Sequence, residues 1–127
     1  MNYRNILLID DDADDHEIFM AALAKVSMAV TCTGYTNAGE ALQKLEQGQI
    51  TTDVIFLDLN MPIMNGQQFL YEIKKRPDLE HIPVVIFSTS SNPSTIQLTK
   101  EMGAMKFITK PDKFNDLVRI LEAFLLQ

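Results

Sequence analysis

The sequence predicts an α/β protein whose parallel sheet is covered by helices on both faces. Three short, continuous apolar runs, at residues 6–9, 54–57 and 84–87, have the composition of strands that are buried on both faces. Segments with a helical spacing of apolar residues lie between these runs, and this alternation favours right-handed crossovers and a doubly wound sheet. A chain of 127 residues is expected to form one domain over residues 1–127, with no further domain.

The remaining elements have weaker patterns. Residues 29–33 and 106–109 are predicted as the second and fifth strands. Four helices are expected where apolar residues share one helical face, at 18–26, 41–45, 69–73 and 114–125. A fifth helix is predicted after Asn92-Pro93, which has the pattern of an N-cap followed by proline, and Gly103 suits its C-terminal cap.

The net charge of −6 comes from one acidic segment. Six of the 17 acidic residues fall between residues 10 and 17, and the other 11 are matched by 11 Lys and Arg. A net acidic domain lacks the basic surface that phosphate backbones require, so direct nucleic-acid binding is not expected. No apolar run approaches the length of a membrane span, and we expect no membrane association and a cytoplasmic location. The single cysteine, Cys32, is interpreted as a small core residue in a reducing compartment.

Polar and charged residues follow the predicted strands at their carboxyl ends. Asp10 and Asp11 follow the first strand, and Asp58 follows the third. Ser88 follows the fourth strand and Lys110 the fifth. Open parallel sheets bind ligands beyond the carboxyl ends of their strands, so these side chains are expected to share one rim.

The three carboxylates predict a metal site. Two carboxylates about 4 Å apart repel by about 4 kcal/mol at an effective dielectric constant of about 20, so a proton or a cation is needed between them. Oxygen ligands without histidine or thiolate favour Mg²⁺, with Mn²⁺ as the alternative ion. The expected ligands are Asp10, Asp11, Asp58 and the backbone carbonyl of Asn60.

Asp58 has the setting of a nucleophile, because it follows a buried strand and precedes a turn. A carboxylate presented in this way can form an aspartyl phosphate. Lys110 is predicted to pair with Asp58 and then to neutralise charge on the transferring phosphoryl group. Ser88 would donate a hydrogen bond to a phosphoryl oxygen, so that catalysis would consist of positioning and charge neutralisation.

Together these residues resemble the receiver domains of two-component response regulators, of the stand-alone, chemotaxis-regulator type. The segment from Asp58 to Gly66 matches the family pattern D-x-x-M-P-x-M-x-G, and Ser88-Thr89 and Lys110-Pro111 stand at the family's Ser/Thr and Lys-Pro positions. The spacings, 30 residues from Asp58 to Ser88 and 22 from Ser88 to Lys110, are also similar to those of the family. The likeness covers the whole chain. Its long acidic segment resembles receivers that are partnered with phytochrome-type or other hybrid kinases.

The resemblance implies a flavodoxin-like fold with strand order 2-1-3-4-5 and a phosphorylation switch. A histidine kinase or a phosphotransfer protein would present a phosphohistidine to Asp58, and the protein would catalyse only its own phosphorylation and dephosphorylation. Ser88 and Phe107 would be the switch residues, acting through the face of the fourth helix, fifth strand and fifth helix. The resemblance implies a separate downstream protein as the partner, and dimerisation through this face is left open. The family also implies a cis peptide bond between Lys110 and Pro111.

Two other functions share part of this pattern. A haloacid-dehalogenase-type phosphatase also uses a strand-end aspartate, Mg²⁺, a hydroxyl and a lysine, but it needs a second aspartate where this chain has Asn60. A degenerate receiver that acts only as a binding module would lack the acceptor, an acidic ligand or the lysine, and this chain has all three.

The other polar residues near the site are given plainer roles. Asp14, Asp15 and Glu17 are expected to open the first helix, where acidic side chains favour the helix dipole, and the role of Asp12 is left undecided. His16 has no spacing typical of a metal ligand and is interpreted as solvated.

Overall fold

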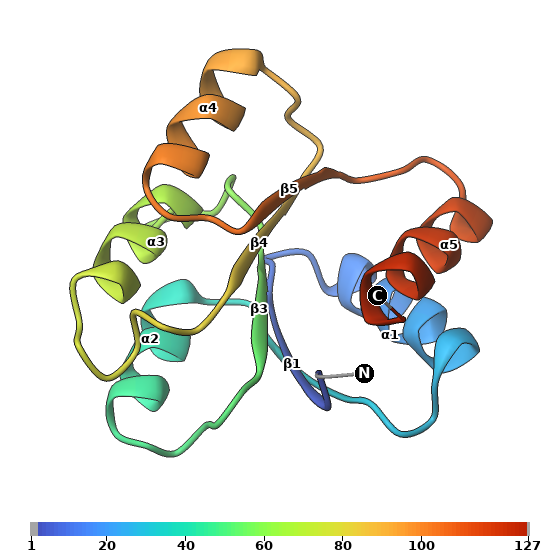
Figure 1. Ribbon diagram of the computed structural model, residues 1–127, viewed down its shortest axis with the longest axis horizontal. Helices are drawn as coiled ribbons and strands as arrows, with labels where there is room; N and C mark the ends of the chain where they lie inside the picture. The colour runs from blue at the N-terminus through green and yellow to red at the C-terminus, as the bar shows by residue number, and fades with distance from the viewer. Residues whose placement is uncertain (1–2, 127) are drawn as a thin grey trace.

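The computed structural model describes residues 3–126 and contains alternating strands and helices (Figure 1). The strands are β1 (Asn5–Ile9), β2 (Thr31–Tyr35), β3 (Val54–Leu57), β4 (Val84–Ser88) and β5 (Lys106–Thr109). The helices are α1 (Ala13–Val26), α2 (Ala38–Glu46), α3 (Gly66–Lys74), α4 (Pro93–Glu101) and α5 (Phe114–Leu125). No helix among residues 3–126 is long and apolar enough to cross a membrane.

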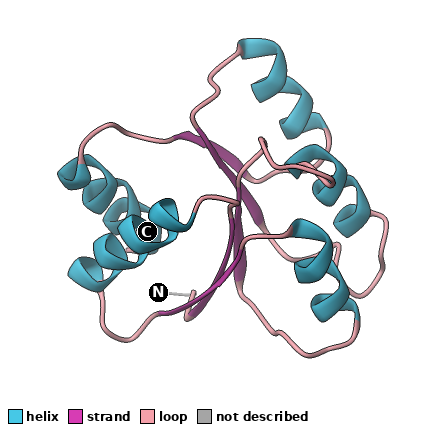
Figure 2. Ribbon diagram, turned by 180° about the vertical axis from the view of Figure 1, so that it is seen from behind, coloured by secondary structure: helices cyan, strands magenta, loops and turns pink. Residues whose placement is uncertain are grey.

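The strands form one parallel sheet in the order β2-β1-β3-β4-β5, as predicted. Helices α1 and α5 lie on one side of this sheet, and α2, α3 and α4 lie on the other (Figure 1). The view from behind shows the same three layers, with the strands enclosed between the two groups of helices (Figure 2). Because both faces are covered, the central strands are buried throughout, which explains their continuous apolar runs.

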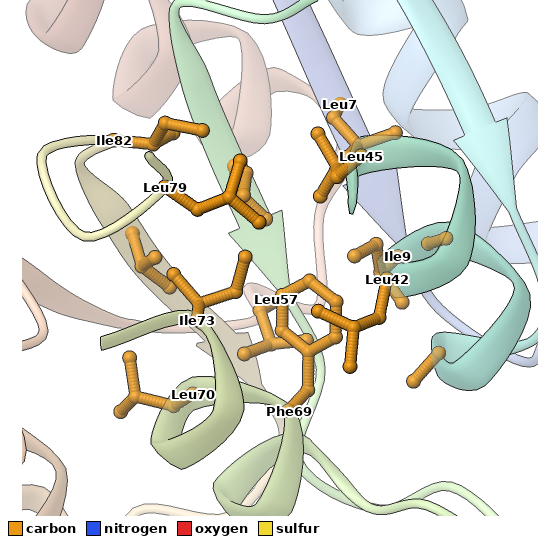
Figure 3. Close-up of a cluster of buried hydrophobic side chains, with 14 of the residues drawn as sticks. Leu7, Ile9, Leu42, Leu45, Leu57, Phe69, Leu70, Ile73, Leu79 and Ile82 are labelled. Atoms are coloured by element: carbon orange, nitrogen blue, oxygen red, sulfur yellow. The ribbon is translucent and has the colours of Figure 1, made fainter. Parts of the chain in front are cut away.

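The core has two halves, one on each side of the sheet. Figure 3 shows the half beneath α2 and α3, where Leu42, Phe69 and Ile73 point toward Leu57 of β3. The other half lies beneath α1 and α5 and contains a group of aromatic rings. Phe56 lies at the centre of that group, with its ring 5.1 Å from that of Phe19. The two halves hold the sheet rigidly, so the strand ends present their side chains from a fixed base.

Side-chain caps set the N-terminal ends of α1, α2, α3 and α4. Asn92 accepts a hydrogen bond from the backbone N–H of Ser94, and Pro93 is the first residue of α4, as predicted. Gly103 follows α4 with a φ of 106°, which suits glycine. Helix α3 has a reciprocal capping box at its start, in which Asn65 and Gln68 each accept a hydrogen bond from the other's backbone N–H.

The predicted range of the second strand was wrong. It was placed at residues 29–33, whereas β2 runs from Thr31 to Tyr35. The register explains the shift, because Gly34 and Tyr35 pair with the last two residues of β1 and extend the ladder to its end. Pairing with a neighbouring strand therefore outweighed the weak strand propensity of glycine.

Candidate functional site

The candidate site lies at the carboxyl ends of β1, β3 and β5, where backbone hydrogen bonds continue beyond the strands. The Asp58 N–H donates to the Ile9 carbonyl at 2.9 Å, and the Lys110 N–H donates to the Ser88 carbonyl at 2.8 Å. These bonds fix Asp58 relative to the end of β1 and Lys110 relative to the end of β4. The predicted rim therefore exists, and it brings Asp10, Asp58 and Lys110 together from positions up to 100 residues apart.

Asp10, Asp11 and Asp58 form the predicted acidic cluster. One carboxylate oxygen from each lies within 4.8 Å of the other two. Asp10 and Asp58 are buried, with 1% and 6% of their surface exposed, whereas Asp11 is exposed. Buried carboxylates so close together need a cation, and an all-oxygen donor set with an open side suits Mg²⁺ or Mn²⁺. The residues present therefore fit a divalent ion.

Lys110 supplies the positive charge at this cluster. Its Nζ lies 2.7 Å from Asp10 Oδ2, 2.8 Å from Asp15 Oδ2 and 3.4 Å from Asp58 Oδ2. The side chain is 11% exposed, and Nζ also lies 5.7 Å from the centre of the Phe87 ring. The predicted pair with Asp58 is present, but it is the longest of the three contacts.

Burial and pairing act in opposite directions on the ionisable groups of the site. Burial raises the pKa of Asp10 above its usual range, against the hydrogen bonds from Lys110 and from the Asp12 backbone. Burial alone would lower the pKa of Lys110, but its hydrogen bonds to Asp10 and Asp15 outweigh this and raise it. Lys110 is therefore a permanent cation at neutral pH.

Asp15 is a site residue that the sequence interpretation missed. It was expected only to open the first helix, as were Asp14 and Glu17. Its carboxylate instead accepts a hydrogen bond from Lys110 Nζ. No local pattern distinguishes it from Asp14, because its partner lies 95 residues away. Asp12 also has a definite role, since it is the N-cap of α1 and accepts a hydrogen bond from the Asp14 N–H at 2.8 Å.

His16 is not simply solvated, contrary to the sequence interpretation. Its ring is half-buried, and Nε2 lies 2.6 Å from the backbone carbonyl of Asp10. The ring occupies the space beside Gly34 of β2, where a β-carbon would lie 2.7 Å from Cε1. The missing side chain at Gly34 therefore leaves room for a ring that holds the Asp10 backbone in place.

The other predicted residues lie around the rim. Ser88 is fully buried at the end of β4, and its hydroxyl oxygen accepts a hydrogen bond from the Ser90 N–H at 3.3 Å. Asn60 is exposed two residues after Asp58, and it shares a polar cavity of about 300 Å³ with Ser90. Phe107 is half-buried on β5, where its ring packs against the core half beneath α3.

The predicted cis peptide bond between Lys110 and Pro111 was wrong. Every peptide bond among residues 3–126 is trans. The trans form of a bond before proline is favoured by about 0.5–1 kcal/mol unless the surroundings select the other isomer. Here the Lys110 N–H still reaches Ser88 and its Nζ still reaches the three carboxylates, so the contacts of the site are made with the ordinary isomer.

Comparison with known proteins places this geometry in a family. A family model for the response regulator receiver domain matches residues 6–122. The two-component response regulator ORR12 of Oryza sativa subsp. japonica is 36% identical over 121 residues, which cover 95% of this chain and 98% of that protein. The response regulator Rcp1 of Synechocystis sp. is 30% identical over 122 residues, which cover 92% of this chain and 83% of that protein.

Solved structures show the same fold. The phosphorylated cyanobacterial phytochrome response regulator RcpA has a TM-score of 0.87 and 31% identity, over 96% of this chain and 91% of that one. The Mn²⁺-bound form of Rcp1 has a TM-score of 0.85 and 28% identity, over 95% of this chain and 91% of that one. Receivers bind Mg²⁺ or Mn²⁺ at an acidic site and work with histidine kinases or phosphotransfer proteins. The chain therefore belongs to the response regulator receiver domain family, the phosphoacceptor signalling proteins of two-component systems.

Proposed function

We propose that Asp58 accepts a phosphoryl group from the phosphohistidine of a histidine kinase or phosphotransfer protein, in a step that requires Mg²⁺. The observation that supports this most directly is the position of the Asp58 carboxylate, which is buried, belongs to the acidic cluster and lies 3.4 Å from the Lys110 ammonium. A nucleophile flanked by a cation site and a fixed positive charge is the arrangement that phosphoryl transfer needs.

In the proposed step, a carboxylate oxygen of Asp58 attacks phosphorus and forms the new P–O bond. The P–N bond to the donor histidine breaks, and its electron pair stays on the imidazole nitrogen. Asp10, Asp11, Asp58 and the backbone carbonyl of Asn60 would hold Mg²⁺, which supplies positive charge for the phosphoryl oxygens when it is bound. Lys110 neutralises a further oxygen, and the Ser88 hydroxyl donates a hydrogen bond to another.

The output is binding to a separate protein. Ser88 and Phe107 lie on β4 and β5, so a shift of Ser88 toward the phosphoryl group and a turn of the Phe107 ring would change the face formed by α4, β5 and α5. We propose that this face contacts a downstream protein, or a second copy of the chain. The single domain over residues 1–127 and the cytoplasmic location remain predictions.

The test is a phosphorylation assay in which the intact mass of the protein is the readout. The protein is incubated with acetyl phosphate, with Mg²⁺ or with excess chelator, and its intact mass is recorded over time. We expect a gain of one phosphoryl group that requires Mg²⁺ and is absent from Asp58→Asn. Asp53→Asn is the matched control, because this aspartate lies at the opposite end of β3 and should leave the mass gain unchanged.

Two results would contradict the proposal. One is the absence of any mass gain in the wild-type protein with Mg²⁺. The other is a gain that persists in Asp58→Asn or in excess chelator, which would place the modification elsewhere. The phosphatase alternative is disfavoured, because it requires a general acid at position 60 and Asn60 cannot transfer a proton.

A further inference from the structure

Lys110 divides its hydrogen bonds among three carboxylates, and one of them lies outside the candidate metal site. An ammonium group has three N–H donors. Those of Lys110 face Asp10 at 2.7 Å, Asp15 at 2.8 Å and Asp58 at 3.4 Å. Asp10 and Asp58 belong to the acidic cluster that could hold a metal ion, whereas Asp15 does not.

Asp15 reaches Lys110 from helix α1, whereas the cluster residues follow strands β1 and β3. Asp15 is the third residue of α1, and its side chain is one-third exposed. The Lys110 Nζ also lies over the Phe87 ring, 5.7 Å from its centre. The ammonium is therefore bonded most closely to Asp10 and Asp15, and its distance from Asp58 is longer than a good charged hydrogen bond.

We propose that Asp15 is a positioning residue for phosphotransfer: its carboxylate holds the Lys110 ammonium away from Asp58 in the unphosphorylated protein and releases it, at least in part, to the phosphoryl group. This inference rests on the proposed function of Asp58. It assigns a role in the site to an acidic residue that neither binds the metal nor accepts phosphate.

The competition follows from the charges and donors involved. A bound divalent ion would occupy the oxygens of Asp10 and Asp58, which weakens their hold on Lys110 but leaves the contact with Asp15 intact. An incoming phosphoryl group carries about −1.5 to −2 charges and needs a donor from Lys110. Asp15 competes for that donor and also adds negative charge beside an anionic phosphodonor. Both effects slow phosphorylation.

The experiment compares the phosphorylation rates of two variants that remove the same charge from adjacent positions. Asp15→Asn removes the partner of Lys110, and Asp14→Asn removes an exposed acid on the same helical turn that makes no contact with Lys110 among the described residues. With acetyl phosphate and Mg²⁺, we expect the rate constant of Asp15→Asn to exceed that of the wild type about threefold. Asp14→Asn should keep the wild-type rate, as should Asp15→Glu, which retains the charge.

A faster rate separates positioning from a merely structural role, because damage to the site would slow phosphotransfer. A structure of Asp15→Asn gives a second readout, in which the distance from Lys110 Nζ to Asp58 Oδ2 should fall below its present 3.4 Å. The inference is overturned if Asp15→Asn is as fast as or slower than the wild type, or if Asp14→Asn is accelerated equally. Those results would leave Asp58 as the acceptor, whereas no phosphorylation of the wild type would end both proposals.

Discussion

Gly66, the first residue of α3, packs its α-carbon against the backbone carbonyl of Asp58, the proposed acceptor. A β-carbon on Gly66 would lie 2.8 Å from the α-carbon of Leu59 and closer still to the Asp58 carbonyl oxygen. The Gly66 N–H also donates to the Leu59 carbonyl at 3.0 Å. The start of α3 therefore packs directly against the turn that carries Asp58 and clamps it in place. Only glycine, which has no β-carbon, fits at this position of the D-x-x-M-P-x-M-x-G pattern.

This contact predicts a large effect for Gly66→Ala. The added methyl group meets backbone atoms that cannot rotate away, so the free energy of unfolding should fall by about 1–3 kcal/mol, and the turn at Asp58 should shift. Urea unfolding measures the first effect, and the phosphorylation rate with acetyl phosphate measures the second. Gly39→Ala is the control, because its β-carbon would meet only the Asn37 side chain, at 3.3 Å. A Gly66→Ala protein with wild-type stability and rate would contradict the clamp.

The three contacts of Lys110 predict that Lys110→Met destabilises the metal-free protein. The buried Asp10 loses its cation, and the free energy of unfolding in chelator should fall by about 3 kcal/mol at neutral pH. Added Mg²⁺ should restore more stability to this variant than to the wild type, because Lys110 no longer competes with the ion for the carboxylates. Thermal unfolding with chelator and with Mg²⁺ measures both effects.

Lys113→Met is the matched control for this prediction. Lys113 is exposed in the loop after Lys110, and it makes no ion pair with any residue in the 3–126 range. Its removal changes the net charge equally and should leave the response to Mg²⁺ unchanged. An equal response in the two variants would show that Lys110 acts only through net charge.

The positive φ of Ile63 leads us to expect that a substitution at this position stabilises the protein. Ile63 is the only residue other than glycine with a positive φ among residues 3–126, at 68°, and its side chain is 93% exposed. A β-branched residue in the left-handed region costs about 1–2 kcal/mol, whereas asparagine tolerates this conformation. Ile63→Asn should therefore raise the free energy of unfolding by about 1 kcal/mol, measured in urea.

Met28→Asn serves as the control for Ile63→Asn. Met28 is 88% exposed and has no positive φ, so the same kind of polar replacement should change stability by less than about 0.5 kcal/mol. If both variants shift stability equally, the gain comes from replacing an exposed apolar side chain with a polar one, and the backbone strain at Ile63 is not its cause.

Cys32 predicts a pH dependence of chemical labelling. Burial raises the pKa of its thiol to about 12, so at neutral pH its thiolate fraction is far below that of free cysteine. Labelling by iodoacetamide at pH 7.5 should be about a thousandfold slower than that of free cysteine. Free cysteine reaches its maximum rate above pH 9, whereas the rate of Cys32 should keep rising tenfold per pH unit.

Labelling of the unfolded chain is the control for Cys32. In urea the thiol should react at the rate of free cysteine and follow the same pH profile. A folded protein that labels as fast as the urea-treated one, or whose rate levels off near pH 9, would contradict the effect of burial.

Much of the fold and the site could be predicted because the signals are local. The apolar runs of β1, β3 and β4 indicate strands that are buried on both faces, and the residues directly after them necessarily meet at one edge of a parallel sheet. Asp10, Asp58 and Lys110 are found in this way without knowledge of any contact. The capping sequence Asn92-Pro93 is equally local, because its hydrogen bond spans only two residues.

Two of the errors concern features that depend on partners far away in the chain. The range of β2 is set by its pairing with β1, which favours Gly34 and Tyr35 over Ala29 and Val30. The position of His16 depends on the space left beside Gly34 on a neighbouring strand. Neither relationship leaves a trace in the residues that surround either partner.

The sequence by itself determined the order of the elements, the edge of the sheet that bears the site, and the positions of Asp10, Asp11, Asp58 and Lys110 there. These follow from periodicity and from the chemistry of residue types. Only the tertiary structure decided how Lys110 divides its contacts, with Asp15 at 2.8 Å and Asp58 at 3.4 Å. The reason is physical: side-chain distances depend on how helix α1 packs across the strand ends, and sequence spacing carries no information about that packing.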